Sequence, residues 1–386
     1  MYDFDRQIDR QGTWSVQWDG IADRFGVPDL LPFTISDMDF ASPPEVLAAL
    51  RERVDHGVFG YTDWRLGEFR EAIHHWYASR YGAEIDPGTL VYAPSVLSQL
   101  SQLLQMWTAP GDGVVVHTPT YDGFRKAVTG LGRELRGVPV DDPAALEREL
   151  ARPDSRMLLL CSPHNPTGRV WTEEELTVFA ELAERYGAAV VSDEIHADLT
   201  TEGHRHVPWT RIAEPGRGRR WALITSGTKA FNFPALSGSY GMVGDPDERE
   251  AFVRRMETGE GLASPAVLSL TAHIAAYRQG AAWLDELRGY VAGTMDMLRK
   301  RLAEGLPEIE WTPPQAGYLA WIDLRPLGIE ETRLQEELVA VEKVAIMPGG
   351  VYGTPGFVRL NVGCPRSKAE RGVDALVRAA NRLRTA

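Results

Sequence analysis

The chain has 386 residues, of which 44% are hydrophobic and 25% charged, and its formal net charge is −13 at pH 7. This length predicts one large domain and a smaller one, because a single core stops growing beyond roughly 250–300 residues. The acidic balance argues against nucleic-acid binding, which needs a basic face, and the basic stretch 216–220 is interpreted as a solvated turn. No apolar run approaches the ~20 residues that span a membrane. A polar N-terminus and only two cysteines, Cys161 and Cys364, predict a cytoplasmic protein without disulfides.

Short β-branched runs alternate with amphipathic helical stretches through the centre of the chain. The runs predicted to be buried strands are 114–117, 156–161, 188–192, 222–226 and 239–243. A helix is predicted over 172–187, because Thr172 and Glu175 match a capping box and Gly187 suits the residue after a helix end. Strands that alternate with helices indicate an α/β fold with a mainly parallel sheet covered on both faces.

The two predicted domains divide the chain between its centre and its ends. The large domain is predicted over 46–285, and the small domain combines 1–45 with 286–386. The elements predicted around and after the boundary are a long helical stretch, two strands and a closing helix, at 263–305, 318–322, 357–361 and 368–384.

Three polar segments follow strands of the predicted sheet. They are SPHNPTG at 162–168, SDEIH at 192–196 and SGTKAFN at 226–232. In parallel sheets, ligands bind at the carboxyl ends of the strands. Because these three segments open at the same edge, they are predicted to form one cluster.

The residue types in this cluster match the ring of pyridoxal 5′-phosphate (PLP). Lys229 supplies the amine that an aldehyde cofactor needs for a Schiff base. Asp193 at a strand end can keep the pyridine nitrogen protonated. Asn165, or a tyrosine hydroxyl, can donate to the phenolate oxygen. Taken singly, a lysine here indicates a surface charge and an aspartate a helix cap; only their order and spacing together point to one cofactor site.

The phosphate of such a cofactor needs hydroxyl and backbone N–H donors. Ser226, three residues before Lys229, offers a hydroxyl. The predicted helix start at Ser95, Val96 and Leu97 offers a second set of donors.

The order NPTG, SDEIH and SGTKAFN resembles fold-type I PLP-dependent enzymes of aminotransferase class I and II. More narrowly, the chain resembles the MalY/PatB branch of carbon–sulfur lyases, the cystathionine β-lyases. The likeness extends over essentially the whole chain and includes LPFTISDMDF (31–40), HGVFGYT (56–62), HTPTYDGF (117–124), VAIMPGGVYG (344–353) and FVRLNVGCPRSK (357–368). It implies a large domain with a mainly parallel, seven-stranded-type sheet between helices, and a smaller α+β domain.

The resemblance also implies roles for single residues. Lys229 carries the cofactor and moves protons, Asp193 pairs with the pyridinium, and Asn165 lies near the ring oxygen. Tyr121 stacks on the ring, with an ordinary buried aromatic as the alternative. Arg359 binds the substrate α-carboxylate, because a guanidinium grips a carboxylate with two hydrogen bonds.

Two further positions bear on the assembly and the reaction. Tyr61 resembles the tyrosine that reaches the phosphate of a neighbouring subunit, which implies a homodimer. Many aminotransferases of this fold place an arginine eight residues after the lysine, where this chain has Ser237. That departure favours a lyase over a typical aminotransferase.

The predicted function is PLP-dependent β-elimination from a sulfur amino acid, such as L-cystathionine to homocysteine, pyruvate and ammonia. Other cysteine S-conjugates stay open as substrates. An aminotransferase shares the steps through the carbanion, and a keto-acid requirement separates the two. A bifunctional member of the branch also represses a transcription activator, so a regulatory protein partner stays open. No metal is predicted, because His204 and His206 lack a third ligand at metal spacing.

Overall fold

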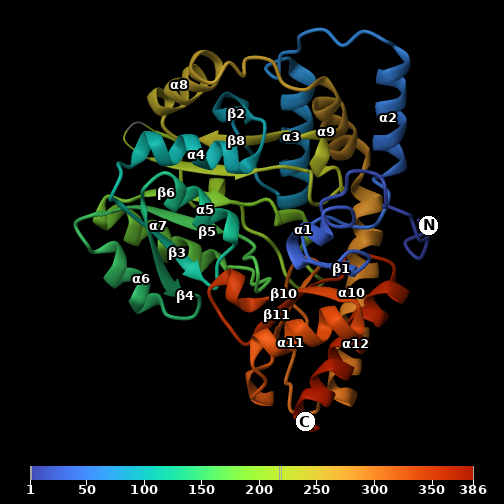
Figure 1. Cartoon of the computed structure of the whole chain (residues 1–386). Helices are drawn as coiled ribbons and strands as arrows, with labels where there is room; N and C mark the ends of the chain where they lie inside the picture. Colours follow the sequence, from blue (N-terminus) through green and yellow to red (C-terminus); the bar gives the residue numbers. More distant parts are fainter. Residues whose placement is uncertain (1, 217, 219, 386) are drawn as a thin grey trace. The chain divides into compact units, whose positions relative to one another are not determined.

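The computed structural model describes residues 2–216, 218 and 220–385 (Figure 1). Arg217 and Arg219 of the predicted turn at 216–220 therefore lie outside the described residues. The chain divides into two compact units. The central unit comprises Ser42–Asn165 and Arg169–Leu284, and the terminal unit comprises Met1–Ala41, Pro166–Gly168 and Asp285–Ala386. We propose that these two units are the two domains. The domain boundaries at residues 46 and 285, which the sequence predicts, remain a prediction.

The central unit is built on a seven-stranded sheet in the order β2-β8-β7-β6-β5-β3-β4. Its strands are β2 (Leu90–Ala93), β3 (Gly113–Thr118), β4 (Glu134–Pro139), β5 (Ser155–Cys161), β6 (Ala189–Asp193), β7 (Trp221–Thr225) and β8 (Ser239–Val243). All neighbours pair in parallel except β8, which is antiparallel to both β2 and β7. The predicted mainly parallel α/β sheet is confirmed, and the five predicted strands are all present.

Eight helices of the described residues begin in the central unit and end there (Figure 1). They are α2 (Pro44–Asp55), α3 (Gly67–Tyr81), α4 (Val96–Trp107), α5 (Asp122–Gly130), α6 (Pro143–Leu150), α7 (Glu173–Tyr186), α8 (Pro246–Arg254) and α9 (Val267–Gln279). Helix α7 has the predicted ends: Thr172 and Glu175 form a capping box, and Gly187 follows with φ 68°. The long helical stretch predicted at 263–305 is broken at Gly280, where a Cβ would lie 2.6 Å from Ala276 O.

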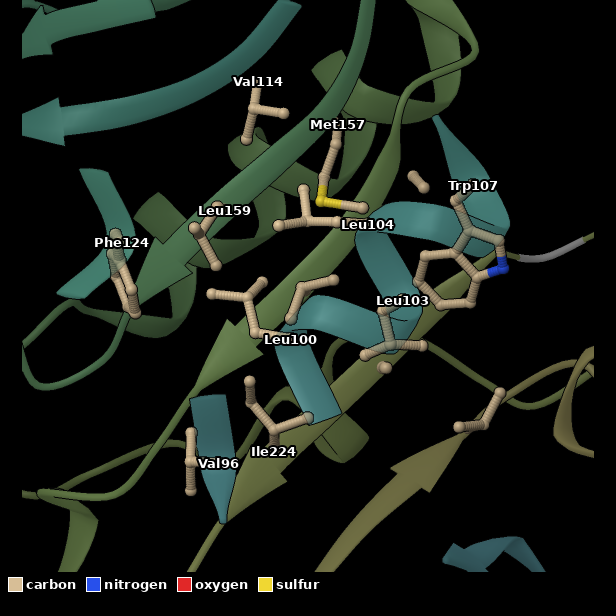
Figure 2. Close-up of a cluster of buried hydrophobic side chains, with 14 of the residues drawn as sticks. Val96, Leu100, Leu103, Leu104, Trp107, Val114, Phe124, Met157, Leu159 and Ile224 are labelled. Carbon is tan, nitrogen blue, oxygen red and sulfur yellow. The ribbon is translucent and has the colours of Figure 1, made fainter. Parts of the chain in front are cut away.

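Helix α4 packs against one face of the central sheet and forms the core shown in Figure 2. Its residues Leu100, Leu103 and Leu104 are fully buried. The strand residues in this cluster include Val91, Val114, Val116, Met157, Leu159, Cys161, Val191, Ala222 and Ile224. Because side chains alternate along a strand, Val115 and Leu158 belong to the opposite face, and they are buried as well. Both faces of the sheet are therefore covered, as the alternating pattern predicts.

The terminal unit contains a four-stranded sheet in the order β1-β10-β11-β9. Its strands are β1 (Leu31–Phe33), β9 (Leu319–Asp323), β10 (Val344–Pro348) and β11 (Phe357–Asn361), and its helices are α1 (Ile21–Phe25), most of α10 (Ala281–Gly305), α11 (Glu331–Glu337) and α12 (Arg366–Thr385). Strand β1 pairs with β10 in parallel, and the other two pairings are antiparallel. This combination of helices with a small, mostly antiparallel sheet agrees with the predicted smaller α+β domain. In the part of the chain that the structure describes, no helix is long and apolar enough to cross a membrane.

Candidate active site

The carboxyl ends of the central strands bring the three predicted segments together. In the registers of β5, β6 and β7, Cys161 lies opposite Asp193, and Asp193 lies opposite Ile224. The Ser162 N–H donates to Asp193 O at 2.9 Å, and the Glu194 N–H donates to Ile224 O at 2.9 Å. The segments that contain Asn165, Asp193 and Lys229 therefore leave the sheet side by side, at the edge where parallel sheets bind ligands.

Asp193 is a buried carboxyl at the centre of this edge, with 4% of its surface exposed. Its side chain lies on the α4 face, because Ala189 and Val191 of the same strand belong to the core on that face. The Ile195 N–H donates to Oδ1 at 3.1 Å. Burial, together with the negative charge of Glu194, raises the pKa of Asp193 to about 7, although the Ile195 N–H and the charge of Lys229 both lower it. Such a carboxyl is suited to a cationic partner.

Lys229 lies in the loop after β7 and is half-buried between two buried neighbours, Thr228 and Ala230. Two backbone hydrogen bonds fix this loop. The Phe231 N–H donates to Gly227 O at 3.0 Å, and the Phe233 N–H donates to Thr228 O at 3.0 Å. The charge of Lys229 lowers the pKa of Asp193.

Ser226 is held by hydrogen bonds inside the central unit. Its hydroxyl lies 2.7 Å from Gly238 O and 3.1 Å from His273 Nε2, and it accepts the Thr228 N–H at 3.2 Å. Burial lowers the pKa of His273 to about 4, so the ring is neutral. His273 Nδ1 lies 2.8 Å from Ser269 O, which places the proton on Nδ1 and leaves Nε2 as an acceptor. The one proton of the Ser226 hydroxyl therefore goes to either Gly238 O or His273 Nε2. The role of Ser226 toward a phosphate stays a prediction.

His273 is a residue that the sequence argument missed. It is on α9, 47 positions after Ser226, and it is 1% exposed. No local motif marks it, because its partner is distant in the sequence.

The start of α4 opens at the same edge of the sheet, because it follows β2, which runs in the same direction as β7. Ser95 is the N-cap, and its hydroxyl accepts the Ser98 N–H at 3.1 Å. The first N–H groups of an α-helix have no acceptor within the helix, so Val96 and Leu97 present theirs at this end. The backbone N–H groups of Val96 and Leu97 match the predicted anion site. The Ser95 hydroxyl, in contrast, already accepts the Ser98 N–H as the helix cap.

Tyr121 and Asn165 border the core on the α4 face. Tyr121 is half-buried, packs against that core and lies 5.6 Å from Phe124 between ring centroids. Asn165 is buried, and its backbone N–H donates to Cys161 Sγ at 3.4 Å. Burial, together with the charge of Asp193, raises the pKa of the Cys161 thiol well above its usual range. Cys161 therefore stays protonated and is a buried packing residue, as predicted.

The terminal unit carries Arg359, on β11. Only 3% of its surface is exposed. One guanidinium nitrogen donates to Thr34 O at 2.8 Å, and the guanidinium lies 4.6 Å from the centre of the Tyr352 ring. The Thr34 carbonyl and the Tyr352 ring are uncharged neighbours, and a guanidinium binds a carboxylate with two hydrogen bonds.

Comparison with known proteins defines the family. Residues 28–376 match the family model of aminotransferase class I and II, so the chain belongs to that family. It is 50% identical to the protein MalY of Escherichia coli K12, over 100% of both chains, and 36% identical to the cystathionine β-lyase PatB of Bacillus subtilis 168, over 96% of this chain and 97% of that one. A solved structure of the PLP-bound C–S lyase of Staphylococcus hominis matches 98% of each chain with a TM-score of 0.91 and 26% identity. The predicted fold and the predicted MalY/PatB-type resemblance are confirmed.

Proposed function

We propose that this protein is a PLP-dependent carbon–sulfur β-lyase, which cleaves L-cystathionine or a related cysteine S-conjugate to a thiol, pyruvate and ammonia. The observation that carries the proposal is the buried Asp193 carboxyl at the carboxyl end of β6, with Lys229 in the loop that follows the neighbouring strand β7. Full-length identity of 50% to MalY and the match to PatB support the lyase reaction. Two free, buried cysteines, Cys161 and Cys364, fit action in a reducing cytoplasm.

The residues at this edge fit PLP by the chemistry of their side chains. Asp193 is a buried carboxyl that gains from a cation such as a protonated ring nitrogen. Lys229 offers an amine for the aldehyde, and the start of α4 offers N–H groups for the phosphate. We assign Asn165 to the ring oxygen and Tyr121 to the ring face. When bound, PLP supplies an aldehyde that takes up the substrate amine and a ring that draws electrons away from Cα.

The chain's own residues then perform the elimination. Arg359 holds the α-carboxylate, so the substrate keeps one orientation. The Lys229 amine removes the Cα proton, while Asp193 holds the proton on the ring nitrogen. The Cβ–S bond breaks with its electron pair on sulfur, and Lys229 returns a proton to that sulfur. The released 2-aminoacrylate hydrolyses to pyruvate and ammonia.

Arg359 is expected to act mainly on substrate binding. Arg359→Leu replaces a two-pronged charged donor by an apolar side chain, so we expect KM for L-cystathionine to rise about 10- to 100-fold, the range set by hydrogen bonds to charged groups. Steady-state pyruvate assays measure this change, and Arg325→Leu, at an exposed arginine of the same unit, is the matched control. An unchanged KM with reduced kcat would contradict the assignment to the carboxylate.

An aminotransferase is the second candidate, because the chain belongs to the family of aminotransferase class I and II. The fate of the substrate distinguishes them. We expect the purified, PLP-loaded protein to release pyruvate from L-cystathionine with no keto acid added. Activity that appears only after a keto acid is supplied would reject the lyase and leave the cofactor site intact.

We further propose that the active form is a homodimer. The segment between α2 and α3 exposes Val58 by 61%, Phe59 by 55% and Tyr61 by 101%. Apolar side chains gathered in one segment are typical of an interface. Tyr61 is assigned to the phosphate in the second subunit. Sedimentation equilibrium is expected to give the mass of two chains, and the mass of one chain would contradict the dimer.

A further inference from the structure

The segment between α2 and α3, residues 56–66, has an exposed part and an anchored part. In Figure 1 it is the blue connection that joins the two helices. Residues 56–61 are exposed throughout, with Tyr61 at 101%. Thr62 and Arg65 instead bond to residues of the stretch that precedes α9. The change from exposed to anchored therefore falls between Tyr61 and Thr62.

Three hydrogen bonds attach Thr62 to Ser264 and Pro265. The Thr62 N–H donates to Ser264 Oγ at 2.8 Å, and Ser264 Oγ donates back to Thr62 O at 3.1 Å. The Thr62 hydroxyl donates to Pro265 O at 2.6 Å. Both backbone groups of Thr62 and its side chain are thus bonded to one short segment. We call this set of bonds the Thr62 anchor.

The next residues add a second attachment. Arg65 forms an ion pair with Glu257 and another with Asp63, the latter at 3.2 Å. Trp64 is buried, with the guanidinium of Arg65 5.3 Å and that of Arg70 5.9 Å from its ring centre. Because residues 62–65 are fixed in this way, the path of the chain at Tyr61 is set from its C-terminal side.

The anchor also joins an element that supports the Lys229 loop. Ser264 and Pro265 lead directly into α9, and His273 of α9 bonds to Ser226, three residues before Lys229. The base of the exposed segment and the proposed cofactor loop therefore share one support within the central unit.

We propose that Thr62 and Ser264 are positioning residues for cofactor binding, which hold Tyr61 ready for the phosphate bound in a second copy of the chain. This inference rests on the proposed function, because it takes Tyr61 to meet PLP there. A peptide group is planar, so fixing the Thr62 N–H also fixes the carbonyl of Tyr61. A residue whose backbone is already fixed loses less conformational freedom on binding than one on a free loop.

The test measures the dissociation constant of PLP, from the absorbance of the bound cofactor titrated into the cofactor-free protein. We expect Tyr61→Phe to raise this constant about 10- to 100-fold, since a hydrogen bond to a charged phosphate is lost. Ser264→Ala removes two anchor bonds and is expected to raise it about tenfold, and Thr62→Val removes one and is expected to raise it about threefold. Sedimentation of each variant establishes that the dimer persists.

A double-mutant cycle separates positioning from a general loss of stability. If the anchor acts through Tyr61, Ser264→Ala in the Tyr61→Phe background raises the constant less than about twofold. The matched controls are Ser79→Ala and Thr177→Val, exposed hydroxyls that also donate to backbone carbonyls; both are expected to bind PLP as the parent protein does.

The outcomes are distinguishable. The anchor proposal is overturned if Ser264→Ala binds PLP as tightly as the parent protein. It is also overturned if the losses of PLP affinity from Ser264→Ala and Tyr61→Phe add fully in the double variant. Either result leaves the cofactor site in place. If the parent protein and both controls fail to bind PLP, the proposed function itself is wrong.

Discussion

Replacement of Lys229 by alanine is expected to abolish pyruvate release. The Lys229 amine has two tasks, the attachment of the cofactor and the movement of the Cα proton, and an alanine can do neither. A general base alone contributes about 10²- to 10⁴-fold, so we expect kcat/KM for L-cystathionine to fall by at least roughly 10³-fold. Steady-state pyruvate assays at saturating PLP measure the loss.

The loss in Lys229→Ala should be chemical and not structural. Lys229 is half-buried in a loop, and the backbone bonds that fix this loop do not use its side chain. The free energy of unfolding, measured with denaturant, is therefore expected to differ from that of the parent protein by no more than about 1 kcal/mol. Lys300→Ala, an exposed lysine paired with Asp296 on α10, is the matched control and should keep full activity. Full turnover by Lys229→Ala would reject the assigned cofactor lysine.

Lys229→Ala also reports on the dimer when it is mixed with Tyr61→Phe. A mixed dimer contains one site with the Lys229 of the Tyr61→Phe chain and the intact Tyr61 of the other chain. If Tyr61 acts across the interface, unfolding and refolding the two variants together should restore activity at that site, measured at a PLP concentration too low to load the Tyr61→Phe dimer. No recovery in dimers that do form would place Tyr61 in the site of its own chain.

The interior of the central sheet could be predicted from sequence, whereas its margins could not. The five predicted strands, β3, β5, β6, β7 and β8, are the five internal strands. Internal strands are buried on both faces, and they therefore appear as continuous apolar runs. The two missed strands, β2 and β4, are the edges. In β4, buried and exposed residues alternate and Gly137 interrupts the pattern, so the run lacks that signal.

The candidate site divides in a similar way. It was predictable that the segments containing Asn165, Asp193 and Lys229 leave the sheet at one edge, because parallel strands deliver the segments after them there. The partners of Ser226 were not, since His273 comes from a distant helix and Gly238 offers a backbone carbonyl. The break at Gly280 was also missed, because helical periodicity continues on both sides of it. At Gly280 the ring of Phe231 approaches closely, and a Cβ there would meet it at 2.7 Å.

Replacement of Asp193 by asparagine is expected to weaken cofactor binding and yet stabilise the cofactor-free protein. Asparagine has nearly the shape of aspartate and can still accept the Ile195 N–H. It cannot supply the negative charge that a protonated ring nitrogen needs. We expect the dissociation constant of PLP to rise about 10- to 100-fold, and pyruvate release to fall further, because the ring then draws electrons less strongly.

The stability effect follows from the raised pKa of Asp193. Its pKa is about 7 in the folded chain against an ordinary value of 3.8, mainly because burial disfavours the charge. The folded state therefore binds more protons than the unfolded state between these values, and its stability falls as pH rises through that window. A difference of about 3 pKa units corresponds to on the order of 4 kcal/mol. Above pH 7, the cofactor-free Asp193→Asn variant should exceed the parent by up to that amount.

The pH dependence and the effect of PLP make this prediction specific. The stability gap should be nearly constant above pH 7 and shrink by about 1.4 kcal/mol for each pH unit below it, because the parent carboxyl becomes neutral in the folded state. Denaturant unfolding of both proteins at pH 5.5 and pH 8, with and without PLP, measures it. Added PLP should reverse the order, since only the parent pairs its carboxylate with the ring. A cofactor-free variant less stable than the parent at pH 8 would show that burial of this charge carries no cost, and a variant with parent affinity for PLP would remove Asp193 from the cofactor site.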